Sequence, residues 1–192
     1  MFSAFLISTG IVALAEVGDK TQLLALLLAA RFRQPVPIIV GILIATLLNH
    51  TAAAALGGWL TQWLTPAVLR WLLGLGCIAM AAWMLHPDRL DAVDFGNARH
   101  GALLTTCVAF FLAEIGDKTQ VATVALAARF QALTAVIAGT TCGMLLANVP
   151  AVLLGNRLAT RLPVRLVHAV AAALFALLGL ATLLGAGARF GF

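Results

Sequence analysis

Two copies of one charged motif are the residues of this sequence best suited to chemistry. The first copy runs from Glu16 to Gln22 (Glu-Val-Gly-Asp-Lys-Thr-Gln), and the second runs from Glu114 to Gln120 (Glu-Ile-Gly-Asp-Lys-Thr-Gln), 98 residues later. Each copy places two carboxylates and one lysine inside a long apolar stretch. A charged side chain in the middle of a membrane helix costs about 2.5–3.5 kcal/mol on insertion scales. Two matching groups of such charges therefore predict a functional site, built twice.

The composition predicts the kind of protein that holds these motifs. Of the 192 residues, 62% are hydrophobic and only 10% are charged, and the mean hydropathy is +1.05. Soluble domains carry about 25% charged residues. We therefore expect an all-α membrane protein, because a helix satisfies its own backbone hydrogen bonds in lipid. The net charge of +5 does not indicate nucleic-acid binding, since no basic patch with interleaved aromatic residues is present.

Polar and proline-containing interruptions divide the chain into six apolar segments that we expect to span the bilayer. The first would be roughly 40–45 Å long as one straight helix, whereas the hydrocarbon core is about 30 Å thick. It should therefore tilt or break, and Gly18 is its weakest point. The expected spans are residues 2–30, 37–57, 67–85, 101–128, 133–155 and 164–184.

The six expected spans form two repeats. Residues 15–32 and 113–130 are identical at 12 of 18 positions when the chain is shifted by 98 residues. Residues 1–86 form the first three-span repeat, residues 87–100 a polar central loop, and residues 101–192 the second repeat. Three is an odd number, so the second repeat must enter the membrane from the opposite side. This is an inverted-topology repeat, which many secondary transporters use.

The arginine distribution predicts the orientation. Positively charged residues accumulate in cytoplasmic loops, and seven arginines follow the first, third and fifth expected spans, against three on the other side. We therefore expect the central loop to be cytoplasmic and both termini to be periplasmic, in the inner membrane of a bacterium. The seven are Arg31, Arg33, Arg89, Arg99, Arg157, Arg161 and Arg165.

The spacing within each motif predicts a shared face. Residues at positions i, i+3 and i+4 of a helix project together, so Glu16, Asp19 and Lys20 should lie on one face. Each motif is also near the middle of its span, where an inverted repeat brings two such segments together. We therefore expect the four carboxylates to bind one metal ion. They are Glu16, Asp19, Glu114 and Asp117.

The charge count suggests the ligand. Four carboxylates and two lysines leave a charge of −2, which one divalent cation or two protons would balance. Oxygen ligands suit Ca²⁺, Mg²⁺ and Mn²⁺, and crowded carboxylates in a low dielectric favour proton uptake when the site is empty. Neutral oxygens and freed backbone carbonyls could support the site. We expect side-chain oxygens from Thr21, Gln22, Thr119 and Gln120 and backbone carbonyls at Gly18 and Gly116, with Lys20 and Lys118 as charge partners.

A structural alternative is that each motif neutralises itself, with Glu16 or Asp19 pairing with Lys20 on one helix. This alternative leaves acids over, because carboxylates outnumber lysines two to one. A mixed alternative also stays open, in which Lys20 and Lys118 release a carboxylate when the ion arrives.

The sequence resembles a known family on these motifs. Glu-x-Gly-Asp-Lys-Thr, present twice on the first and fourth of about six spans, is similar to the Gdt-type family of cation/proton exchangers, which includes the Golgi manganese/calcium transporter and bacterial manganese exporters. The resemblance covers essentially the whole chain, and the short central loop fits a compact bacterial member. It implies transport of Mn²⁺ or Ca²⁺ against protons, with the acidic motif residues as ligands.

Other polar residues carry weaker signals. Asn49 and His50 lie in the second expected span and Asn148 in the fifth, where they could line the site, although hydrogen bonds between helices are the more common role. Arg70 and His168 occupy matching repeat positions near span starts, and we expect them to be interfacial anchors.

These observations predict a secondary transporter, not an enzyme, that exports Mn²⁺, or Ca²⁺, in exchange for protons by alternating access. The metal is cargo, and no resident cofactor is expected. The main alternative is an exporter of an amino acid or small organic cation, and a membrane scaffold without transport is a further one. The sequence does not fix the oligomeric state, and a homodimer is compatible with it.

Overall fold

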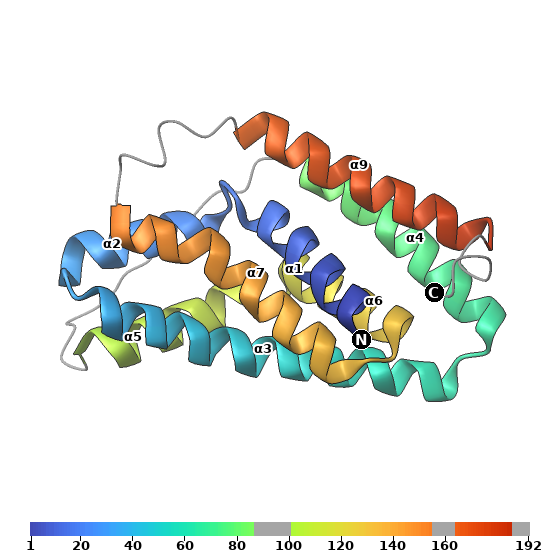
Figure 1. The fold of residues 1–192 in the computed structure, drawn as a ribbon, viewed down its shortest axis with the longest axis horizontal. Helices are drawn as coiled ribbons and strands as arrows, with labels where there is room; N and C mark the ends of the chain where they lie inside the picture. Colours follow the sequence, from blue (N-terminus) through green and yellow to red (C-terminus); the bar gives the residue numbers. More distant parts are fainter. Residues whose placement is uncertain (87–100, 155–163, 186–192) are drawn as a thin grey trace.

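The computed structural model describes residues 1–86, 101–154 and 164–185, and every regular element in these ranges is an α-helix (Figure 1). The expected all-α fold is confirmed. The expected central loop, residues 87–100, lies outside the described residues. In chain order the helices are α1 (Phe2–Glu16), α2 (Lys20–Phe32), α3 (Pro35–Trp63), α4 (Pro66–Met84), α5 (Gly101–Glu114), α6 (Lys118–Phe130), α7 (Leu133–Leu154) and α9 (Val164–Leu183).

Both motifs interrupt a helix. Helix α1 ends at Glu16 and α2 begins at Lys20, and the two helices are bent by 70° relative to each other. Gly18 has a φ angle of +79° and Gly116 a φ angle of +73°. Only glycine adopts this left-handed region at little cost. The predicted break at Gly18 is therefore confirmed, and the second motif has the same break.

The lengths of the helices agree with a membrane protein. Among the residues that the structure describes, four helices are long and apolar enough to cross a bilayer, namely α3, α4, α7 and α9, and α1 and α2 meet this test together as one bent span. Helix α5 is a shorter apolar helix. Together with α6, which follows it, α5 corresponds to the bent pair α1 and α2. Helix α3 ends at Trp63, six residues beyond the expected end at residue 57, and Pro66 begins the next helix.

The two halves of the chain pack closely against each other and do not form separate units. Helix α1 lies along α7, and α5 lies along α3; α2 also contacts α7, and α6 contacts α3 (Figure 1). Under the 98-residue shift, α1, α2 and α3 correspond to α5, α6 and α7. Each half therefore contacts the other through the same pair of elements. The opposite membrane orientation of the two halves stays a prediction.

Two glycines related by the repeat allow this close packing. A Cβ atom on Gly139 of α7 would lie 2.9 Å from the Cβ atom of Ser8 in α1. A Cβ atom on Gly41 of α3 would lie 2.8 Å from the Cβ atom of Thr106 in α5. Small residues permit such approach between membrane helices, where packing takes the place of the hydrophobic effect.

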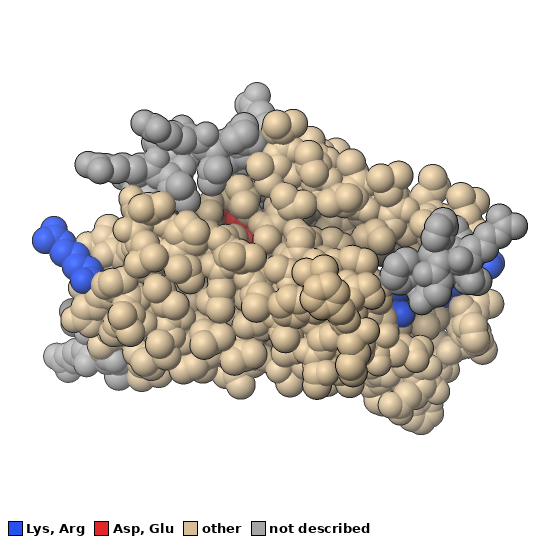
Figure 2. Space-filling model, in the orientation of Figure 1, with Lys and Arg blue, Asp and Glu red and all other residues tan. Residues whose placement is uncertain are grey.

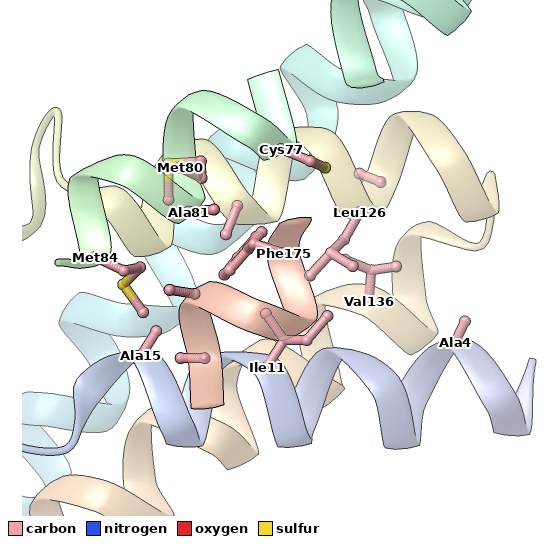
Figure 3. Packing of buried hydrophobic residues seen from close by; sticks show 14 of the residues in the cluster. Ala4, Ile11, Ala15, Cys77, Met80, Ala81, Met84, Leu126, Val136 and Phe175 are labelled. Atoms are coloured by element: carbon pink, nitrogen blue, oxygen red, sulfur yellow. The ribbon is translucent and has the colours of Figure 1, made fainter. Parts of the chain in front are cut away.

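Most of the interior and most of the visible surface are apolar. Figure 3 shows Phe175 of α9 between side chains of α4, such as Ala81, and of α1, such as Ile11, and all three are buried. Figure 2 shows a surface that is almost entirely uncharged, with lysine and arginine atoms at its two ends. Exposed leucines such as Leu153 and Leu177 suit contact with lipid tails rather than with water.

We expect Gly139→Ala to destabilise the protein by about 1–3 kcal/mol, because the added methyl group has no room against α1. The apparent unfolding temperature in detergent measures this effect. Gly10→Ala in α1 is the matched control, since a Cβ atom there meets nothing within 4 Å. If both variants unfold at the wild-type temperature, α1 and α7 do not pack as described.

Candidate metal centre

The motif carboxylates are buried at the two helix breaks. The side chains of Glu16 and Glu114 are fully buried, and Asp19 and Asp117 are only 2% exposed. Each glutamate is the last residue of the helix before its break, and each aspartate precedes the first residue of the next helix. These four are the acidic residues of the described ranges, and Figure 2 shows one small red area of them in a recess.

Two ion pairs connect the motifs to each other. The Lys20 Nζ atom lies 3.0 Å from Oδ1 of Asp117, and the Lys118 Nζ atom lies 2.5 Å from Oδ1 of Asp19. The pairs are reciprocal, since each lysine reaches the aspartate of the other half. They differ in burial, because the Lys118 side chain is fully buried whereas that of Lys20 is 23% exposed.

These pairs correct two expectations from the sequence. Lys20 pairs with Asp117 and Lys118 pairs with Asp19, each across the two halves, so the alternative of motifs that neutralise only themselves is wrong. The expected single helical face is also wrong, because the chain leaves the helix between Glu16 and Lys20. The carboxylates of one motif still converge, but through the turn at Gly18 rather than through helical periodicity.

The threonine and glutamine of each motif stabilise its own break. The Thr21 hydroxyl donates a hydrogen bond to Oε2 of Glu16, and the Thr119 hydroxyl donates to Oε2 of Glu114 at 2.7 Å. The side-chain oxygens of both glutamines accept from the glycine N–H groups of the breaks, each at 2.8 Å. These oxygens therefore have partners already, and their first role is to hold the turn. The glutamines are Gln22, which accepts from Gly18, and Gln120, which accepts from Gly116.

Three of the four carboxylates form a compact group. Oxygen atoms of Glu16, Asp19 and Asp117 all lie within 4.8 Å of one another. Because Ca²⁺ binds oxygen ligands at about 2.3–2.6 Å, oxygens this close can share one ion. Glu114 is not in this group, although its Oε1 atom is buried and makes no hydrogen bond among the described residues. Oε1 of Glu16 and Oδ2 of Asp117 are also buried without a hydrogen-bond partner there, so they are available as ligands.

The weaker polar candidates have three different outcomes. Asn49 donates a hydrogen bond to the Phe111 carbonyl of α5 at 3.1 Å, so the expected bond between helices is confirmed. Asn148 donates to the Met144 carbonyl of its own helix, at 3.1 Å, and that expectation is wrong for it. His50 is fully buried, and neither of its ring nitrogens has a hydrogen-bond partner among the described residues.

The structure places His168 at the first helix break, where the sequence predicts an interfacial anchor. His168 is not an interfacial anchor, because it is only 9% exposed and its Nε2 atom lies 2.7 Å from the Val17 carbonyl oxygen in the first break. Its repeat counterpart Arg70 is exposed, as an anchor would be. The sequence contains one relevant signal, which is the replacement of an arginine by a histidine at this repeat position.

Comparison with known proteins defines the class of this protein. The family model described as "Divalent cation/proton antiporter GDT1" matches residues 4–92 and 102–189, which is nearly the whole chain. The chain belongs to this family, whose members are transporters rather than enzymes. The unmatched residues between the two segments, 93–101, overlap the expected central loop, residues 87–100. Membership confirms the family resemblance noted from the two motifs.

One curated relative is similar to this chain over nearly the whole length of both proteins. The chain is 51% identical over 183 residues to a protein of Vibrio cholerae serotype O1 named "Putative manganese exporter", and the match covers 95% of this chain and 91% of the relative. No solved structure matches the chain. The family and the helical structure together identify an integral membrane protein of divalent-cation transport.

We expect Lys118→Met to destabilise the protein by about 3–5 kcal/mol, because it leaves the Asp19 carboxylate buried without its cation. Thermal unfolding in detergent measures the loss. Lys20→Met is the matched control and should cost less, since the Lys20 side chain is partly exposed. The double variant Lys118→Met/Asp19→Asn should recover most of the lost stability. Equal losses for both single variants, with no recovery in the double variant, would contradict the reciprocal pairing.

Proposed function

We propose that this protein exports Mn²⁺, and Ca²⁺ as a second cargo, in exchange for protons by alternating access. The observation that carries the proposal is the convergence of Glu16, Asp19 and Asp117, from both halves of the chain, at distances that suit one ion. The printed name of the Vibrio cholerae relative favours manganese as the cargo, and the family description favours protons as the counter-ion.

The ion would bind between the two breaks. Glu16 and Asp19 are its proposed ligands from the first half, with Asp117 and Glu114 from the second. Hard oxygen donors suit Mn²⁺ and Ca²⁺ better than copper, and no cysteine or histidine belongs to the motifs. The six charged groups sum to −2, which one divalent ion neutralises. Two protons neutralise the same site, so metal and protons compete for the same oxygens.

Competition between metal and protons would also affect the two lysine–aspartate ion pairs. Each aspartate has one oxygen next to a lysine of the other half. A divalent cation that binds the remaining oxygens repels that lysine and weakens the pair, since like charges in a low dielectric interact strongly. We therefore assign the two pairs as the contacts that loosen when the ion binds, which is the mixed role considered from the sequence.

Alternating access would use the two halves as moving parts. Metal enters from the cytoplasm, the halves rock about the breaks, and the site opens to the other side, where protons displace the ion. This assignment includes the inner membrane of a bacterium, with both termini in the periplasm. Inverted repeats around broken helices are the usual basis of such exchange.

Purified protein in liposomes tests the proposal. We expect Mn²⁺ uptake driven by an imposed pH gradient, loss of uptake when the gradient is collapsed, and slower or equal transport of Ca²⁺. Uptake of an amino acid or organic cation in place of metal would support the main alternative instead. Absence of any flux of metal or protons would support a scaffold.

Glu16→Gln and Glu114→Gln should each reduce Mn²⁺ uptake at least tenfold, because each removes one negative charge and one ligand oxygen from the proposed site. Asp91→Asn is the matched control, since it neutralises a carboxylate of the central polar stretch and should leave uptake within about twofold of wild type. Normal uptake by both glutamine variants would rule out the carboxylate site.

A further inference from the structure

His168 provides a contact between α9 and the first helix break. Its Nε2 atom lies 2.7 Å from the Val17 carbonyl oxygen, and its side chain is buried. A carbonyl oxygen only accepts hydrogen bonds, so Nε2 carries a hydrogen and donates it. Helix α9 also packs against α1, and in Figure 1 the beginning of α9 lies near the turn between α1 and α2.

The Val17 carbonyl, to which His168 donates, lies in the first break, between the proposed ligands Glu16 and Asp19. Val17 follows the last residue of α1, with extended backbone angles of −63° and 116°, so its carbonyl points away from the helical pattern. Carbonyls at a helix end need a partner from outside the helix. Val17 is bonded directly to Glu16 and lies two residues before Asp19. A shift of this peptide unit therefore moves both carboxylates relative to Asp117.

The repeat counterpart of His168 is a different residue with a different neighbour. Under the 98-residue shift, Ile115 corresponds to Val17 and Arg70 corresponds to His168. Ile115 is 54% exposed. Arg70 instead lies near the end of α9, with its Nη1 atom 3.7 Å from the position of a Cβ atom on Gly185. The histidine contact is thus a difference between two otherwise matching halves.

We propose that His168 is a positioning residue for the ion site. By holding the Val17 carbonyl, it fixes the first break in the shape that brings Glu16 and Asp19 to Asp117. This inference rests on the proposed function, because it assigns His168 to the binding of the transported cation. Loss of the donor lets the break relax, so the affinity for the ion falls.

Kinetics of Mn²⁺ uptake into liposomes test the inference. His168→Leu, which has no donor, should raise KM by roughly three- to tenfold, the net value of one hydrogen bond, with kcat within about twofold of wild type. His168→Gln places an amide N–H at a similar reach and should restore KM. Arg70→Gln is the matched control at the corresponding position and should behave as wild type. A fall in kcat at unchanged KM, or no rescue by glutamine, would overturn the inference.

A second measurement needs no metal and no transport. Hydrogen–deuterium exchange of the purified protein in detergent should show faster exchange of amides 16–20 in His168→Leu and wild-type exchange in His168→Gln. Unchanged exchange in His168→Leu would show that His168 does not hold the break. If wild-type protein transports no Mn²⁺ while exchange responds as expected, then the proposed function fails and the structural role of His168 stands.

Discussion

The structure depends on the pairing of buried charges between the two halves of the chain. Charged groups inside an apolar protein are tolerated only when they have partners, and here Lys20 and Lys118 supply partners to the aspartates opposite them. Pairing of this kind requires both motifs to be at helix ends that meet. The glycine breaks provide those ends, and the long helices α7 and α3 pack against α1 and α5 through the two glycines related by the repeat.

Much of this arrangement could be predicted from the sequence because the motif is duplicated. A duplicated charged motif in apolar surroundings implies that both copies lie together, and an overlong first segment with Gly18 in it implies a break. The identity of each lysine's partner could not be predicted, since it depends on how two helix ends approach in space. Helical periodicity even suggested the wrong partners, because it assumes an unbroken helix through Lys20.

The contacts of residues outside the motifs are less predictable from the sequence. Asn49 was interpreted correctly because a buried amide in a membrane helix almost always needs a partner, and a neighbouring helix usually supplies one. His168 was misplaced because its role depends on the position of α9 relative to α1, and apolar packing around Phe175 determines that position. Such packing has no local sequence signal. The exclusion of Glu114 from the compact carboxylate group is of the same kind, since Glu16 and Glu114 occupy equivalent positions in the sequence.

The reciprocal ion pairs have a consequence for the origin of such a chain. Neither half can satisfy its own charges, because each lysine lies against the aspartate of the other half. A shorter ancestor with a single motif could have completed both pairs only by associating with a second copy of itself. Joining the two copies into one chain would then have removed the need for association, and allowed one copy to acquire a histidine where the other has an arginine.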